Sequence, residues 1–191
     1  MPAAAYTEDA MLNAVLKRTI DPPFDVAAKR FVAFNVKADA IALAAFVLGL
    51  AAIAAIAWGH YLPAVVLLAL NRLLDGLDGA VTRATGAGPR AVVAATLGTV
   101  VLTGIPLGFA LADPARALAA AFLICALAGA SAARISTAVR NGADFVESGV
   151  AFVAFAFACL LPDRFSLVAY VLGVLAFVSA GARLAAAARP T

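Results

Sequence analysis

Six long apolar stretches dominate this sequence, and their length constrains the fold more than any other feature. Each is close to the ~20 residues that a helix needs to cross a bilayer. With 65% hydrophobic and 13% charged residues, the chain has more apolar surface than a soluble fold of this size can bury. We therefore predict an all-α polytopic membrane protein whose residues 38–191 form six transmembrane helices. The predicted spans cover residues 38–58, 61–82, 91–112, 115–137, 145–162 and 164–187.

Residues 1–37 have a different pattern, in which charged residues alternate with bulky apolar ones. Phe24 and Phe31 are seven residues apart and share a helical face, and Lys29 and Arg30 lie near them. This pattern predicts an amphipathic helix on the membrane surface, with its basic residues towards anionic headgroups. A solvated lead-in segment is the alternative, but two phenylalanines on one face are unfavourable in free solvent.

The basic residues predict the orientation of the bundle. Most of them lie before the first span, between the second and third, near the fourth-to-fifth connection and at the C-terminus, whereas the opposite side has only Arg116 and Arg164. The positive-inside rule therefore places both termini in the cytoplasm, in a membrane that we expect to be the bacterial inner membrane. Because the basic residues are scattered at helix ends, the net charge of +3 indicates membrane lipids as partners and no nucleic acid.

The second span ends in a group of polar residues, NRLLDGLDGAVTR, over residues 71–83. Asp75 and Asp78 are three residues apart and share a helical face, so one cation would reduce their repulsion. Oxygen ligands of this kind suit Mg²⁺ or Mn²⁺. Gly79 leaves room for a diphosphate or a base beside the backbone, and Arg83 could pair with phosphate. Aspartate near a helix C-terminus opposes the helix dipole, so capping does not explain the pair.

These residues resemble the signature of the CDP-alcohol phosphotransferase family, D-x-x-D-G-x-x-A-R-x8-G-x3-D-x3-D. Asp75, Asp78, Gly79 and Arg83 match its first, second, third and fifth fixed positions. The amphipathic N-terminal segment and the six spans are also similar to the family layout. The resemblance implies a homodimeric membrane enzyme of phospholipid biosynthesis. Such an enzyme transfers the phosphatidyl group of CDP-diacylglycerol, or of a related CDP-linked lipid, to a hydroxyl acceptor and releases CMP.

The resemblance also implies roles for single residues, and four signature positions depart from it. Asp75 and Asp78 correspond to metal ligands, and Gly79 and Arg83 to substrate-binding residues. The departures are Thr82 for alanine, Val92 for glycine, and Thr96 and Val100 for the last two aspartates. In the family, four carboxylates hold two divalent ions and the fourth deprotonates the acceptor alcohol. The two remaining carboxylates predict at most one weakly bound ion. A catalytically inactive member that acts as a partner or regulator of an intact enzyme is therefore an alternative.

Other polar residues on the cytoplasmic side could compensate for the missing aspartates. Glu147, three residues after Asp144 at the start of the fifth span, is the candidate for a substitute base. The alternative is an interfacial residue that is satisfied by Arg140 or by water. Arg134 and Arg140 could bind a phosphorylated group of the substrate or serve only as topology determinants. Asp39, at the start of the first span, is another carboxylate on this side that could substitute, but we favour its interpretation as a charge that complements the helix dipole.

Two further features have weaker implications. Residues 128–133 are a run of small side chains that would let helices pack closely, within the bundle or in a dimer. A channel with Asp75 and Asp78 as an ion site is a third hypothesis, but the third, fourth and sixth spans have almost no polar residues to line a pore.

Overall fold

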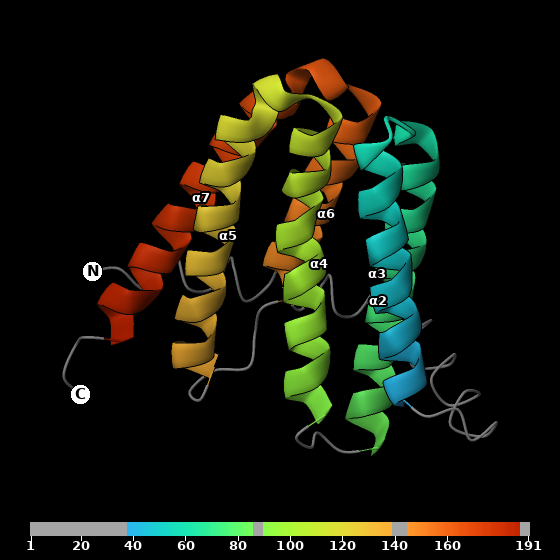
Figure 1. Cartoon of the computed structure of the whole chain (residues 1–191). Coiled ribbons are helices and arrows are strands. Elements are labelled where there is room, and N and C mark those ends of the chain that lie inside the picture. The colour runs from blue at the N-terminus through green and yellow to red at the C-terminus, as the bar shows by residue number, and fades with distance from the viewer. Residues whose placement is uncertain (1–37, 86–89, 139–144, 188–191) are drawn as a thin grey trace.

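The computed structural model describes residues 38–85, 90–138 and 145–187, and within these ranges the chain forms only helices and turns. The α-helices run up and down the bundle side by side (Figure 1). The predicted surface helix over residues 1–37 lies outside the described residues. In chain order the elements are α2 (Ala38–Ala57), α3 (Tyr61–Thr85), α4 (Arg90–Ala112), the 3₁₀ turn η1 (Pro114–Arg116), α5 (Ala117–Ala138), α6 (Phe145–Leu160), the 3₁₀ turn η2 (Pro162–Arg164) and α7 (Phe165–Ala187).

A tight turn at Gly59 reverses the chain between α2 and α3. Gly59 has a φ of 76°, a conformation that glycine adopts without steric cost. Its N–H donates to the carbonyl of Ile56 over 2.9 Å, and the N–H of His60 donates to the carbonyl of Ala55 over 2.8 Å. This is a Schellman motif, which satisfies the last carbonyls of α2. Because α3 begins at Tyr61, the short turn makes α2 and α3 close antiparallel neighbours.

The contact between α2 and α4 depends on small residues. A Cβ added at Gly49 would lie 2.5 Å from the side chain of Val101, and one at Gly108 would lie 2.9 Å from the backbone oxygen of Ile53. Neither distance can be occupied by real carbon atoms without movement. The absence of side chains at both glycines therefore allows the two helices to approach each other closely.

Small side chains also fill the contact between α5 and α7. The run over residues 128–133 is divided by this contact: Ala130 and Ser131 are buried, whereas Ala128 and Ala132 are exposed. The buried residues of the run pack within the bundle. A dimer interface formed by its exposed residues stays a prediction. The buried alanines that join the two helices are Ala126, Ala130, Ala176 and Ala180.

At the end of the bundle where η1 and η2 lie, Arg116 connects several elements. Its Nη1 donates to the hydroxyl of Tyr61 over 3.0 Å. Its Nε lies 3.2 Å from Oδ2 of Asp113, and its Nη2 lies 3.7 Å from Oδ1 of Asp163. One half-buried guanidinium therefore links the start of α3 to both connections at this end of the bundle.

Among the residues that the structure describes, three helical segments are long and apolar enough to cross a membrane, namely Asp39–Ala57, Pro114–Ala132 and Pro162–Ala182. Thr96–Ala112 and Gly149–Leu160 are shorter apolar helices. Large apolar side chains are also exposed on the outer faces of the bundle, where lipid rather than water is the favourable solvent. The prediction of an all-α protein with membrane-spanning helices is confirmed to this extent, and the count of six spans stays a prediction.

Candidate functional site

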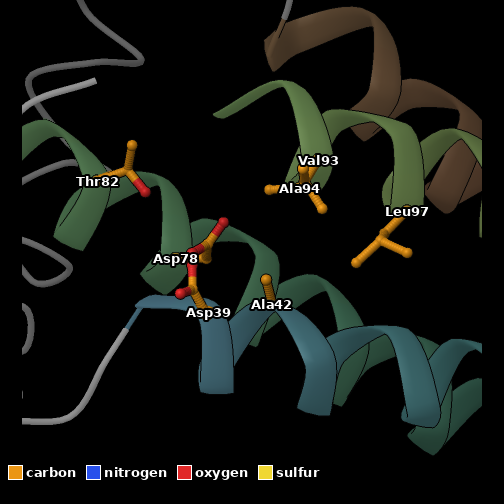
Figure 2. A pocket seen from close by; sticks show the side chains of 7 residues that line it. All are labelled: Asp39, Ala42, Asp78, Thr82, Val93, Ala94 and Leu97. Atoms are coloured by element: carbon orange, nitrogen blue, oxygen red, sulfur yellow. The ribbon is translucent and has the colours of Figure 1, made fainter. Parts of the chain in front are cut away.

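A cavity of about 290 Å³ lies at the end of the bundle where α2 begins, α3 ends and α4 begins (Figure 1). Its volume is close to the lower limit for small-molecule sites. The two aspartates and the threonine that line it come from α2 and α3, whereas α4 contributes only apolar side chains. The lining residues, drawn in Figure 2, are Asp39, Ala42, Asp78, Thr82, Val93, Ala94 and Leu97.

Asp78 is the buried charged group of this cavity. Only 7% of the residue is exposed, because the last turns of α3 pack against the start of α2 around Leu77 and Ile41. Within the described part of the chain, no hydrogen-bond donor or cation pairs with its carboxylate. Asp39 lines the same cavity, and its carboxyl group is drawn near that of Asp78 in Figure 2.

Asp75 has a different environment from Asp78, although both are on α3. Its Oδ2 accepts a hydrogen bond from Nη1 of Arg72 over 3.0 Å. The guanidinium carbon of Arg72 lies 5.2 Å from the ring centroid of Phe152 on α6, within the range of a cation–π contact. A Cβ added at Gly98 would lie 4.0 Å from Oδ1 of Asp75. Asp75 is therefore held by Arg72 on one side and faces α4 on the other.

A second, much smaller space of about 10 Å³ lies next to the cavity, between α2, α3 and α4. Asp75 lines it together with Asn71 and Gly98. Asn71 is 3% exposed, and its Nδ2 donates to the backbone carbonyl of Ala45 over 2.6 Å. Because that carbonyl can only accept, the amide orientation is fixed and Oδ1 points elsewhere, buried without a partner in the described structure. The space is about the size of one water molecule, which could donate to this oxygen.

The structure places the other predicted site residues as follows. Gly79 is partly buried in α3 and lines neither space. Arg83, Arg134 and Glu147 lie in the α3, α5 and α6 helices, but their side chains are outside the described part of the structure. Arg140 lies in a segment that is not described. The substrate-binding roles of the three arginines and the role of Glu147 as a base stay predictions.

The two positions that lack signature aspartates do not line the cavity. Thr96 is exposed and Val100 is 47% exposed, and neither belongs to the cavity wall. The residues of α4 that face the aspartates are instead Val93, Ala94 and Leu97. On the described residues, α4 therefore contributes no carboxylate to this site.

The donor set fits one divalent cation of the Mg²⁺ type. Across residues 38–85, 90–138 and 145–187, no cluster of three or more His, Cys, Asp or Glu side chains has metal-binding geometry. Asp39 and Asp78 nevertheless offer two carboxylates at one cavity. Mg²⁺ often takes one or two carboxylates and completes its shell with water and substrate phosphates.

Comparison with known proteins found a relative in Escherichia coli (strain K12), the inner membrane protein YnjF. The sequences are 30% identical over 167 residues, which cover 76% of this chain and 80% of YnjF. The chain belongs to the family of YnjF. No family model matches the sequence, and no solved structure matches it. A membrane location for this member of the YnjF family agrees with its three segments that can span a bilayer.

Sequence reasoning gave no role to two residues that shape the site of this YnjF-family protein. Asn71 and Arg72 were within the polar stretch but received no role, although polar residues inside an apolar span are functional candidates. Asp39 does lie in the first turn of α2, as expected for a charge that complements the helix dipole. The structure shows that it also lines the cavity beside Asp78. No local sequence signal indicates that contact, since it depends on how α2 and α3 pack.

Proposed function

We propose that this protein is a membrane-embedded CDP-alcohol phosphatidyltransferase. It binds CDP-diacylglycerol, or a related CDP-linked lipid, at the cavity around Asp78 and transfers the phosphatidyl group to a hydroxyl acceptor in phospholipid biosynthesis. The bundle lies in the bacterial inner membrane with six spans and with both termini in the cytoplasm, so that the cavity opens towards soluble nucleotide products. The active form is a homodimer.

One observation carries the proposal: Asp78 has a nearly buried carboxylate that faces a cavity and has no partner in the described structure. An unpaired charge removed from water is destabilising by several kcal/mol. A fold retains such a group where a bound ion compensates its charge. Asp78 is also a position at which the sequence matches the family signature, so the unusual environment and the motif point to the same residue.

The chemistry requires a displacement at phosphorus. The bond between the lipid phosphorus and the oxygen of CMP breaks, a bond from phosphorus to the acceptor oxygen forms, and the acceptor proton passes to a base. A bound Mg²⁺ or Mn²⁺ neutralises charge on the diphosphate. Asp78 and its acidic neighbours hold that ion, and Arg83 contacts phosphate. Gly79 lines neither space, so its predicted role beside the nucleotide depends on how the substrate approaches α3. In this proposal Glu147 is the base, and Arg134 and Arg140 bind phosphate.

The apolar wall of α4 supports a second candidate function. Val93, Ala94 and Leu97 line the cavity where a catalytic site would need polar groups, and Val100 cannot act as a base. In this alternative, the protein binds a CDP-linked lipid without turnover and acts as a partner or regulator of an intact enzyme.

Release of CMP tests the proposal. Purified protein in lipid nanodiscs is incubated with Mn²⁺, CDP-diacylglycerol labelled in the cytidine, and a mixed set of alcohols, and labelled CMP is separated by chromatography. We expect CMP release that falls at least ~100-fold in the Asp78→Asn variant, because metal and acid–base functions contribute effects of this size. Asp163→Asn, whose side chain is 97% exposed at the opposite end of the bundle, is the matched control and should retain activity.

Two results would reject the transferase assignment. One is an absence of CMP release above the Asp78→Asn background with every acceptor. The other is release that Asp78→Asn leaves unchanged. Saturable binding of the CDP-lipid without release would support the non-catalytic alternative.

A further inference from the structure

We propose that one water molecule lies in the small space between α2, α3 and α4 and bridges the side chains of Asn71 and Asp75. Through this water, Asn71 acts as a positioning residue for the carboxylate of Asp75. The bridge depends only on how the three helices pack. Its effect on the site rests on the proposed function, in which Asp75 is a predicted metal ligand.

The amide oxygen of Asn71 requires a hydrogen-bond donor. The residue is 3% exposed, and its Nδ2 is already used in the 2.6 Å hydrogen bond to the carbonyl of Ala45. Its Oδ1 is buried and has no partner in the part of the chain that the structure describes. A buried acceptor without a donor is destabilising, and native proteins nearly always supply one, often as an ordered water.

Oδ1 of Asp75 is the second acceptor at this space. The other carboxylate oxygen, Oδ2, accepts a hydrogen bond from Arg72 over 3.0 Å. A Cβ added at Gly98 would lie 4.0 Å from Oδ1 of Asp75. Asn71, Asp75 and Gly98 all line the space, so the glycine leaves open the volume beside the carboxylate.

A neutral water molecule fits this space better than a cation does. The volume of about 10 Å³ is close to the minimum that one water needs, and the two hydrogen atoms of water match two acceptor oxygens. Asp75 is already paired with Arg72, so a cation would add an uncompensated positive charge to a mainly apolar bundle. The other side chains around the space are apolar, namely those of Ala42, Ala45, Phe46, Ala94, Leu97 and Val101.

The small space adjoins the larger cavity. Ala42, Ala94 and Leu97, which are drawn in Figure 2, line both. A carboxylate that is held at Oδ2 by Arg72 and at Oδ1 by the water has a fixed orientation beside the cavity. Hydrogen bonds of this kind orient metal-binding carboxylates and raise their affinity. Asn71 therefore acts on the site through Asp75 and not by contact with the substrate.

Substitutions at Gly98 test the bridge. Alanine places a methyl group in the space and expels the water without replacing its hydrogen bonds, whereas serine adds a hydroxyl group that can donate to one of the two oxygens. In the full chain in nanodiscs, we expect Gly98→Ser to have a higher Tm than Gly98→Ala, although alanine has the higher helix propensity. At Gly181, where an added Cβ meets nothing within 4 Å in the described structure, the alanine variant should be at least as stable as the serine variant.

Three results of thermal unfolding would overturn the bridge. The first is a Gly98→Ala variant at least as stable as Gly98→Ser, as expected if a methyl group simply fills a packing defect. The second is an equal Tm difference between these two variants in an Asn71→Leu background, where one acceptor has been removed and the difference should shrink. The third is a Tm that rises with NaCl but not with choline chloride in the wild type and with neither in Gly98→Ala, which would indicate a bound cation.

Mn²⁺ affinity tests the positioning role. Electron paramagnetic resonance of free Mn²⁺, titrated with the full chain in nanodiscs of zwitterionic lipid, gives the affinity. We expect Gly98→Ala to weaken binding at least ~10-fold, the lower range for losing an outer-shell partner, and Gly98→Ser to retain most of the wild-type affinity. Because the two side chains are similar in size, a purely steric effect would weaken binding equally in both variants and would reject the role. Gly181→Ala should match the wild type.

The outcomes separate this inference from the transferase proposal. If the wild type neither binds Mn²⁺ nor releases CMP, the transferase proposal and the positioning role both fail, and the order of Tm values at Gly98 still decides the bridge. If CMP release needs Asp78 while both Gly98 variants keep the wild-type Mn²⁺ affinity, the transferase proposal is supported and Asn71 is not a positioning residue.

Discussion

Arg72 and Asp75 show how one ion pair can fix the local electrostatics of a helix inside a mainly apolar bundle. Their side chains are 20% and 35% exposed, and their N–O distance is 3.0 Å. The guanidinium also covers the ring of Phe152, so the pair connects α3 to α6. Arginine suits this position because its planar group can accept ring contact on a face while it donates hydrogen bonds at its edge.

We expect Arg72→Ala to lower the free energy of unfolding by about 1–3 kcal/mol, because Asp75 loses its partner while remaining partly buried. The double variant Arg72→Ala/Asp75→Ala should lose less than the sum of the single variants, with a coupling of ~0.5–3 kcal/mol. Denaturation by SDS in mixed micelles measures all four proteins of the cycle. Strictly additive losses would show that the ion pair does not contribute to stability.

For single residues, the sequence predicted which end of the second span is charged but not which charged side chains are partners. The motif singled out Asp78 as a metal ligand, which stays a prediction, and the structure places this residue at a cavity. It grouped Asp78 with Asp75 by spacing along α3, whereas in the structure Asp75 pairs with Arg72 and Asp78 shares its cavity with Asp39. Helical spacing indicates which residues share a face, but partners on other helices are determined by tertiary packing.

Among the elements, α2 and α4 form a contact that is sensitive to side-chain size. Gly108 faces the backbone oxygen of Ile53, where an added Cβ would lie at 2.9 Å. At Gly104 an added Cβ would instead meet Cδ1 of Ile53 at 2.7 Å. A terminal methyl group can rotate away, but a backbone carbonyl in a helix cannot move without shifting the helix.

We therefore expect Gly108→Ala to destabilise the protein by about 1–3 kcal/mol, the usual cost of overpacking, despite the ~1 kcal/mol that alanine gains over glycine in helix propensity. Gly104→Ala should cost less. Gly181→Ala, which meets nothing within 4 Å in the described structure, is the matched control and should be neutral or slightly stabilising. Thermal unfolding in detergent ranks the three variants, and equal effects at all three positions would contradict a close α2–α4 contact.

For the helices, the sequence predicted where each helix of the bundle lies, but only approximately where it begins and ends. The predicted span over residues 61–82 corresponds to α3 at Tyr61–Thr85, and the one over residues 145–162 corresponds to α6 at Phe145–Leu160. The length of each apolar stretch and the turn residues on either side of it are sufficient to predict these helices. The rotation of α4 about its own axis could not be predicted from the sequence, because nearly all faces of this helix are apolar. For this reason the exposure of Thr96 and Val100 emerged only from the structure.

The two ends of the whole molecule have different chemistry. One end has the cavity with Asp39, Asp78 and Thr82. At the other end, Arg116 is half buried and forms contacts with Tyr61 and the aspartates of both connections. The first end has a cavity and, among the described residues, a carboxylate without a partner at Asp78, whereas the second has charges paired around Arg116. This asymmetry agrees with a site that serves one aqueous compartment.

The proposed topology predicts that these two ends lie on opposite sides of the inner membrane. In a background with Cys125 and Cys159 replaced by alanine, Asp163→Cys should react with a membrane-impermeant maleimide added to intact spheroplasts. Thr82→Cys, at the cavity, should react only after the membrane is opened, because the positive-inside bias places that end in the cytoplasm. Labelling of both positions from outside, or the reverse pattern, would reject the orientation. The proposed transferase function would also require a cytoplasmic cavity, since CDP-linked donors and released CMP belong to that compartment. The labelling result therefore constrains the function as well as the topology.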